Sequence, residues 1–161
     1  MKELDSYLND HLAGSVDALE LVEYWAHLHD NKPLGAFFSD IGTDIRADQG
    51  ALRDVMHRLA IDESNVRKAG AWAAEKAGRA RLTIAGYELG SLGLVLTLEG
   101  LIMGVIGKKF MWRALAARNL PQLRGYNFQK LERRAEQQIE RIEVERIRVA
   151  QQAFTGMVTS R

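Results

Sequence analysis

The chain has 161 residues, of which 47% are hydrophobic and 27% charged, with only 2 prolines and no cysteine. These values predict one globular domain over residues 1–161 and exclude collagen-like, disordered, disulfide-scaffold and thiolate-metal proteins. The formal net charge is +1, but residues 1–50 carry −7, whereas 51–117 and 118–161 carry +4 each. Such segregation favours packing of the chain against itself over a nucleic-acid partner, which needs a sustained basic surface.

The N-terminal residues read Met-Lys-Glu-Leu-Asp-Ser, with acids and no apolar run. A secretory signal has a basic start followed by an apolar stretch, and this segment has neither arrangement. We therefore expect a cytoplasmic protein.

Apolar residues recur every three or four positions along four long segments, as they do in amphipathic helices. The predicted helices cover about 3–29, 36–61, 88–118 and 127–154. A short additional helix is predicted at 66–81, and no segment alternates with period two for long enough to form a strand. The fold class is therefore all-α, an antiparallel four-helix bundle with a short extra helix between helices two and three.

The third predicted helix is apolar over residues 89–107, long enough to suggest a membrane span. Glu99 lies in the middle of this stretch, where a charge costs several kcal/mol in hydrocarbon. The other three helices are amphipathic. We therefore expect a helix buried in the protein and no membrane partner.

Each predicted helix places one polar side chain near the middle of its apolar stripe, at Ser15, Asp48, Glu99 and Arg146. If the helices of each pair fold back on one another, position 99 faces position 145 and position 48 faces position 19. An unpaired buried charge costs several kcal/mol. The pattern therefore predicts one buried polar cluster, with Arg146 pairing with Asp48 and Glu99 and with Ser15 nearby.

Four segments carry a resemblance to a known family: Leu8-Asn9-Asp10-His11-Leu12 and Asp48-Gln49-Gly50-Ala51, then Glu99, then Glu143-Val144-Glu145-Arg146. In this order and spacing they resemble the four helices of the ferritin-like superfamily. The resemblance implies a di-metal site with a glutamate on the first helix and Glu-x-x-His pairs on the second and fourth. Here Ser15 stands at the glutamate position, and residues 51 and 146 are not histidine.

The surviving acids at the family's positions are Asp48, Glu99 and Glu143, which form the alternative metal site, holding di-iron or di-manganese. A two-metal site needs about four carboxylates, and an arginine cannot ligate a cation. We therefore expect no cofactor and a structural role for Arg146. Glu23 and His27, spaced i and i+4, suggest a separate surface metal pair, although a solvated pair is the simpler interpretation.

Three classes of function remain open. The first is a non-catalytic ferritin-like protein acting by assembly or partner binding, which we favour, so an enzyme is not expected. The second is a divergent metal-dependent oxidase or iron-handling protein. The third binds an unidentified small molecule between the two helix pairs.

A homodimer is expected because the third helix carries a second apolar row opposite Glu99, consisting of Leu94, Leu98, Leu101, Val105 and Trp112. The first helix adds Leu21, Trp25 and Leu28 outside its own stripe. Exposed apolar surface of this extent usually marks an interface. The short helix bearing Trp72 is the alternative cover for this surface.

Overall fold

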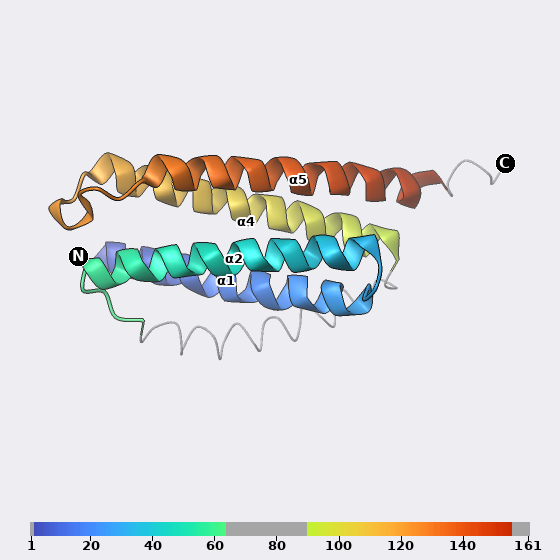
Figure 1. The fold of residues 1–161 in the computed structure, drawn as a ribbon, viewed down its shortest axis with the longest axis horizontal. Coiled ribbons are helices and arrows are strands. Elements are labelled where there is room, and N and C mark those ends of the chain that lie inside the picture. Colours follow the sequence, from blue (N-terminus) through green and yellow to red (C-terminus); the bar gives the residue numbers. More distant parts are fainter. Residues whose placement is uncertain (1, 64–89, 156–161) are drawn as a thin grey trace. The chain divides into compact units, whose positions relative to one another are not determined.

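A computed structural model describes residues 2–63 and 90–155, which form four α-helices and a short 3-10 turn and contain no strand (Figure 1). The helices are α1 (Lys2–Leu28), α2 (Pro33–Arg58), α4 (Ser91–Arg118) and α5 (Phe128–Phe154), and the turn is η1 (Pro121–Leu123). The predicted all-α class is confirmed, with every described helix end within three residues of its expected place. The predicted helix at 66–81 lies outside the described residues, and the ferritin-like arrangement stays a prediction.

The helix ends follow from local residue chemistry. Pro33 occupies the first turn of α2, where its missing N–H leaves no bond unmade. The Asn127 side chain caps α5 by accepting a hydrogen bond from the Lys130 amide at 2.9 Å. Three helices are each followed by a residue in the left-handed conformation that closes a helix C-terminus, at Asn31, Ala60 and Asn119.

The described residues belong to two compact units, each built on one pair of helices. The first unit contains α1 and α2 together with residues 118–126, and the second contains α4 and α5. In Figure 1 the two helices of each pair run side by side in opposite directions.

The seam of the first unit is apolar and aromatic. The rings of Trp25 and Phe38 stack with centroids 6.1 Å apart, and both side chains are buried. Gly35 lies against the His29 carbonyl, where a side chain would overlap the backbone. The other buried apolar residues of the two helices are Leu8, Leu12, Val22, Ile41, Ile45, Leu52, Val55 and Met56.

Residues 118–126 are anchored to α2 within the first unit. The Tyr126 hydroxyl donates a hydrogen bond to the Ala51 carbonyl at 3.0 Å. The Arg58 guanidinium lies 5.1 Å from the centre of the Tyr126 ring, a cation–π contact. Leu123 of η1 is buried beside them in the same segment. This connection is therefore packed against the helix rather than a free loop.

Ion pairs link the two helices of the second unit along their edge. Lys109 pairs with Glu136 at 2.9 Å and Arg113 with Glu132 at 3.0 Å, so residues of α4 and α5 meet in antiparallel order. Arg146 of α5 reaches Glu99 of α4 at 3.4 Å, which confirms that position 99 faces the neighbourhood of position 145. Trp112 and Phe128 close one end, with ring centroids 6.2 Å apart.

The assignment of faces on α4 is corrected by the structure. The row predicted to lie outside is buried: Leu94, Leu98, Leu101, Val105 and Trp112. Glu99 is exposed, and of its apolar neighbours Leu92 is exposed and Ile102 and Ile106 are half-buried. Trp25 of α1, also predicted outside, is buried against Phe38. Because α4 is apolar almost all round, its sequence pattern does not show which face is buried. Burial of the large Trp112 ring removes more apolar surface from water than burial of any other side chain of the helix.

Candidate functional site

The exposed side of α4 carries a row of large apolar side chains. They are Leu92, Leu96, Met103 and Phe110, with exposed fractions of 47%, 50%, 68% and 56%. Their spacings of four, seven and seven residues place them on one face of the helix. We call this row the α4 face. It spans 18 residue steps, or roughly 27 Å at the rise of an α-helix.

Two glycines beside this row make no close contact with the described part of the chain. A Cβ added at Gly100 or at Gly104 would meet no atom of residues 2–63 or 90–155 outside its own helix backbone within 4 Å. A glycine inside a helix costs about 0.5–1 kcal/mol relative to alanine. Their presence is explained if a second surface approaches α4 closely at this point.

The length and composition of α4 are also those of a membrane-crossing helix. Among the described residues, α4 is the one helix that is long and apolar enough to cross a membrane. In the structure, 39% of its most apolar stretch is buried. The expectation that this helix is buried in the protein rather than in a membrane stays a prediction. Glu99, half exposed on the same side, places a charge in the middle of the apolar row.

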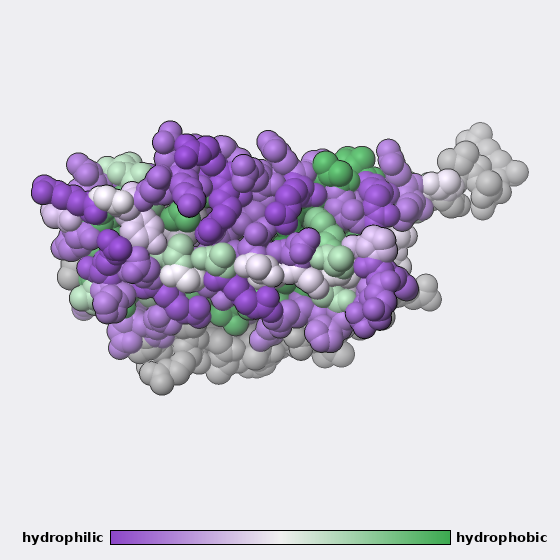
Figure 2. Space-filling model, viewed as in Figure 1, coloured by the Kyte–Doolittle hydropathy of each residue, from purple (hydrophilic) through white to green (hydrophobic). Residues whose placement is uncertain are grey.

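The surface of α5 contrasts with the α4 face. Figure 2 shows mostly hydrophilic residues along α5, interrupted by a small hydrophobic patch toward its C-terminal end. The exposed large apolar residues of this helix are Val144, Ile147 and Phe154. A small number of exposed apolar residues is normal on soluble proteins, so α5 supplies a control surface.

The four residues of the predicted polar cluster are divided between the two units. Asp48 is buried and Ser15 half-buried in the first unit. The Ser15 hydroxyl donates to the Leu12 carbonyl of its own helix at 2.6 Å. Glu99 and Arg146 belong to the second unit, so their joining with Asp48 and Ser15 stays a prediction.

Within the second unit Arg146 binds two carboxylates. Its Nε and Nη2 donate to the two oxygens of Glu143 at 2.6 and 2.7 Å, a bidentate pair, and its Nη1 reaches Glu99 at 3.4 Å. The side chain of Arg146 is 22% exposed, and that of Glu99 is 49% exposed. The hydrogen bonds from Arg146 lower the pKa of the Glu143 carboxyl and raise that of the guanidinium. The pairing of Arg146 with Glu99 is confirmed, but it is partly solvated rather than buried.

The acids of the alternative metal site do not fit a di-metal centre. Both oxygens of Glu143 already accept hydrogen bonds from a cation that would repel a metal ion. Glu99 contacts the same guanidinium. Throughout residues 2–63 and 90–155, no three histidine or acidic side chains group closely enough to hold a metal ion.

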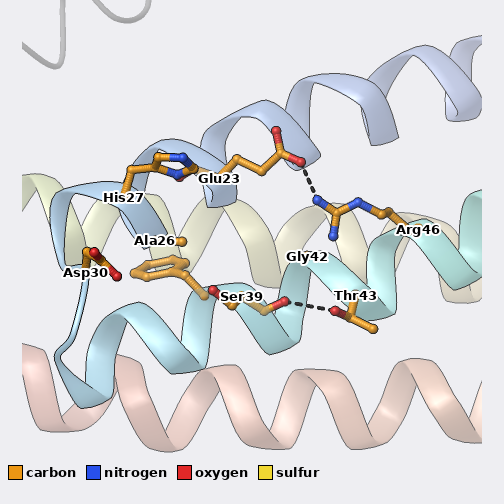
Figure 3. Close-up of a pocket in the computed structure, with 9 residues that line it drawn as sticks. Glu23, Ala26, His27, Asp30, Ser39, Gly42, Thr43 and Arg46 are labelled. Carbon is orange, nitrogen blue, oxygen red and sulfur yellow. Dashed lines mark hydrogen bonds and ion pairs between the residues drawn. The ribbon is translucent and has the colours of Figure 1, made fainter.

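Glu23 and His27 line a groove between α1 and α2 with a volume of about 480 Å³ (Figure 3). Glu23 forms an ion pair with Arg46 across the groove, and the His27 ring bonds the Glu23 backbone carbonyl rather than its carboxylate. The two side chains are therefore not arranged as a metal pair. Spacing alone singled out Glu23 and His27, but it missed the matching residues of α2.

Comparison with protein-family models, with curated proteins and with solved structures gives no match. The function must therefore be inferred from the residues and surfaces of the chain itself.

Proposed function

We propose that the protein is a non-catalytic helical protein of the ferritin-like type that acts by assembly, and that its assembled form is a homodimer joined through the α4 face. The observation that carries this proposal is the row of four exposed apolar side chains on one side of α4. An exposed apolar row of this length favours removal from water on association, even with Glu99 in its middle. The interface originally expected from Leu101 and Trp112 is excluded because both side chains are buried.

A second copy is the occupant that the pattern of the α4 face favours. A two-fold axis through Met103 places Leu96 opposite Phe110 of the second copy and Met103 opposite itself. The same axis places Glu99 opposite Gly107, so no acid faces another acid. Gly100 and Gly104 have room around them and would allow the two helix backbones to approach. The face is thus complementary to its own copy.

The metal-dependent alternative is less well supported. Redox or hydrolytic chemistry at Asp48, Glu99 and Glu143 requires carboxylates available to a cation, and Arg146 engages two of the three. A guanidinium at this point stabilises the carboxylates electrostatically without a metal. The chain is therefore proposed to have no metal cofactor and no catalytic centre.

The test measures mass in solution by light scattering at micromolar concentration. The wild type is expected at about twice the 18.1 kDa of one chain. Leu96→Glu combined with Met103→Glu places charges in the proposed interface and should give a monomer. The control is Val144→Glu, which adds an acid at an exposed apolar position of α5 and should leave the dimer intact.

A wild-type mass of one chain would contradict the dimer. A dimer that survives the double substitution would contradict this interface. A flotation assay with phosphatidylcholine vesicles tests a membrane as the alternative partner. If the wild type floats with the vesicles and the double variant does not, the α4 face binds a lipid surface and not a second copy of the chain.

A further inference from the structure

The groove between α1 and α2 is bordered by two rows of polar side chains with the same spacing (Figure 3). The row on α2, Ser39, Thr43 and Arg46, follows the i, i+4, i+7 pattern of one helix face. The facing row consists of Glu23 and His27 of α1 and Asp30 of the turn that follows α1. Because the helices are antiparallel, Glu23 lies opposite Arg46 and Asp30 lies toward Ser39.

One end of the groove is closed by the ion pair between Glu23 and Arg46. The guanidinium lies over Gly42, since a Cβ at that residue would be 3.6 Å from Arg46 Nη1. The floor is formed by Ala26, Gly42 and the buried Phe38. The positive charge of Arg46 is thus already matched, and the middle of the groove is apolar at its base.

The remaining groups of the groove are mainly hydrogen-bond acceptors. His27 Nδ1 lies 2.8 Å from the Glu23 carbonyl, which can only accept, so Nδ1 carries the proton and Nε2 of the neutral ring is an acceptor. The Thr43 hydroxyl donates to the Ser39 carbonyl at 3.1 Å, which leaves the lone pairs of Thr43 Oγ1 to accept.

Asp30 completes the acceptor set at the end of α1. Its carboxylate oxygens accept from the Asn31 amide at 2.9 Å and from the Asn31 side chain at 3.0 Å. A carboxylate has about four acceptor positions, so two donors do not saturate it. The charges of Glu23 and Arg46 cancel in their ion pair, so the negative charge of Asp30 dominates the lining.

We propose that this groove binds a small organic molecule with a primary ammonium group. A positive charge and N–H donors match Asp30 and the neighbouring His27 at the end of the groove away from the ion pair, whereas an anion would face Asp30. The hydrocarbon part of the ligand lies along Ala26 and Gly42 toward the ion pair. The volume of about 480 Å³ falls in the range of small-molecule sites. This proposal does not depend on dimerisation, because none of these residues belongs to α4.

The experiment titrates ¹⁵N-labelled protein with hexylammonium chloride and follows the backbone amide signals by NMR. Saturable shifts are expected at Ser39, Gly42 and Thr43, with a dissociation constant on the order of a millimolar for so small a ligand. The uncharged analogue 1-hexanol and the anionic analogue hexanoate, of equal length, should shift these signals at least about tenfold less at equal concentration.

Asp30→Asn should weaken hexylammonium binding about tenfold, the loss for a hydrogen bond to a charged group. The matched control is Asp40→Asn, which removes the same charge at an exposed position of α2 outside the groove and should leave binding unchanged. If both variants weaken hexylammonium binding equally, the effect comes from the overall charge of the protein and not from Asp30 in the groove, which contradicts the site. Equal binding of 1-hexanol, stronger binding of hexanoate, or absence of saturable shifts would also overturn it.

Discussion

The two helix pairs have nearly equal helix lengths and both bury apolar side chains, but they differ in the polar contacts between their helices. Between α1 and α2, the stacked Trp25 and Phe38 rings are buried and the polar groups lie along a groove at the edge. Between α4 and α5, ion pairs such as Arg113–Glu132 line the seam. Because α5 is strongly polar outside one stripe, α4 has more apolar surface than a single partner helix uses. The second pair therefore carries the surface suited to assembly, and the first pair carries the pocket.

The largest effect is expected from two aromatic residues of α4 that lie two positions apart. Trp112 is fully buried and Phe110 is exposed. Trp112→Ala should lower the free energy of unfolding by about 3–5 kcal/mol, the scale of a buried aromatic truncation. Phe110→Ala should change it by less than about 0.5 kcal/mol but weaken the proposed dimer. Urea unfolding and light scattering on the same samples measure both quantities.

This pair of variants directly tests which face of α4 is buried. Similar losses of stability from both would show that the second pair has no distinct outer face. A stability loss confined to Phe110→Ala would restore the assignment predicted from sequence, with Glu99 on the buried side. Helicity by circular dichroism at zero urea confirms that the variants being compared are folded.

Two glycines should respond in opposite directions to the same substitution. A methyl group at Gly35 overlaps the His29 carbonyl at the α1–α2 turn, so Gly35→Ala should cost about 1–3 kcal/mol. Gly100 on α4 has open space around it, so Gly100→Ala should stabilise the helix by about 0.5–1 kcal/mol. The free energy of unfolding of Gly100→Ala is measured in the chain that also carries Leu96→Glu and Met103→Glu, so that dimerisation does not contribute.

In the chain without those two glutamates, Gly100→Ala tests whether the proposed dimer requires close approach of the two α4 helices. The added methyl group would separate the α4 helices and lower the dimer affinity measured by sedimentation equilibrium. A dimer strengthened by this substitution would mean that close approach at Gly100 is not needed.

The existence and ends of the four helices were predictable because each has strong local signals. Pro33 marks the break before α2, Pro121 follows α4, and Asn127 caps α5. Gly35 was predicted to belong to the break, but it lies in the first turn of α2, so the predicted start of that helix is three residues late. Periodicity also identified the buried stripes of α2 and α5, where polar and apolar faces differ clearly. It failed on α4, where almost every face is apolar and the choice depends on which surface the rest of the fold covers.

The candidate sites were predicted less well than the fold. Glu99 and Arg146 were correctly paired because antiparallel register follows from connection length. The preference of Arg146 for Glu143, three residues earlier on its own helix, was missed, although i and i+3 spacing is a known ion-pair signal. The groove was missed because its two walls come from different helices, and only their contact shows that the rows of Glu23 and Ser39 face one another.

A smaller effect is expected at the ion pairs of the second helix pair. Because Arg146 lowers the pKa of Glu143, the pair stabilises the folded state above the ordinary pKa of a glutamate. This contribution is lost as pH falls through the lowered folded-state pKa. Arg146→Met should raise the pKa of Glu143, measured by carboxyl ¹³C NMR, and reduce stability more at pH 7 than at pH 3. An unchanged Glu143 pKa would contradict the bidentate pair.

The smallest effect is expected at His11 in the first helix pair. Partial burial lowers the pKa of His11 below its ordinary value of 6.5, and its ring packs edge-on against Tyr7 with centroids 4.7 Å apart. Below pH 6.5 the unfolded chain binds a proton at this residue before the folded chain does, so stability falls until the folded-state pKa is passed. His11→Gln should make the unfolding free energy less dependent on pH between 7 and 5. An unfolding profile of His11→Gln that parallels the wild type would contradict this prediction. An NMR titration of folded His11 with a midpoint at or above pH 6.5 would show that the ring is solvated rather than packed against the first helix pair.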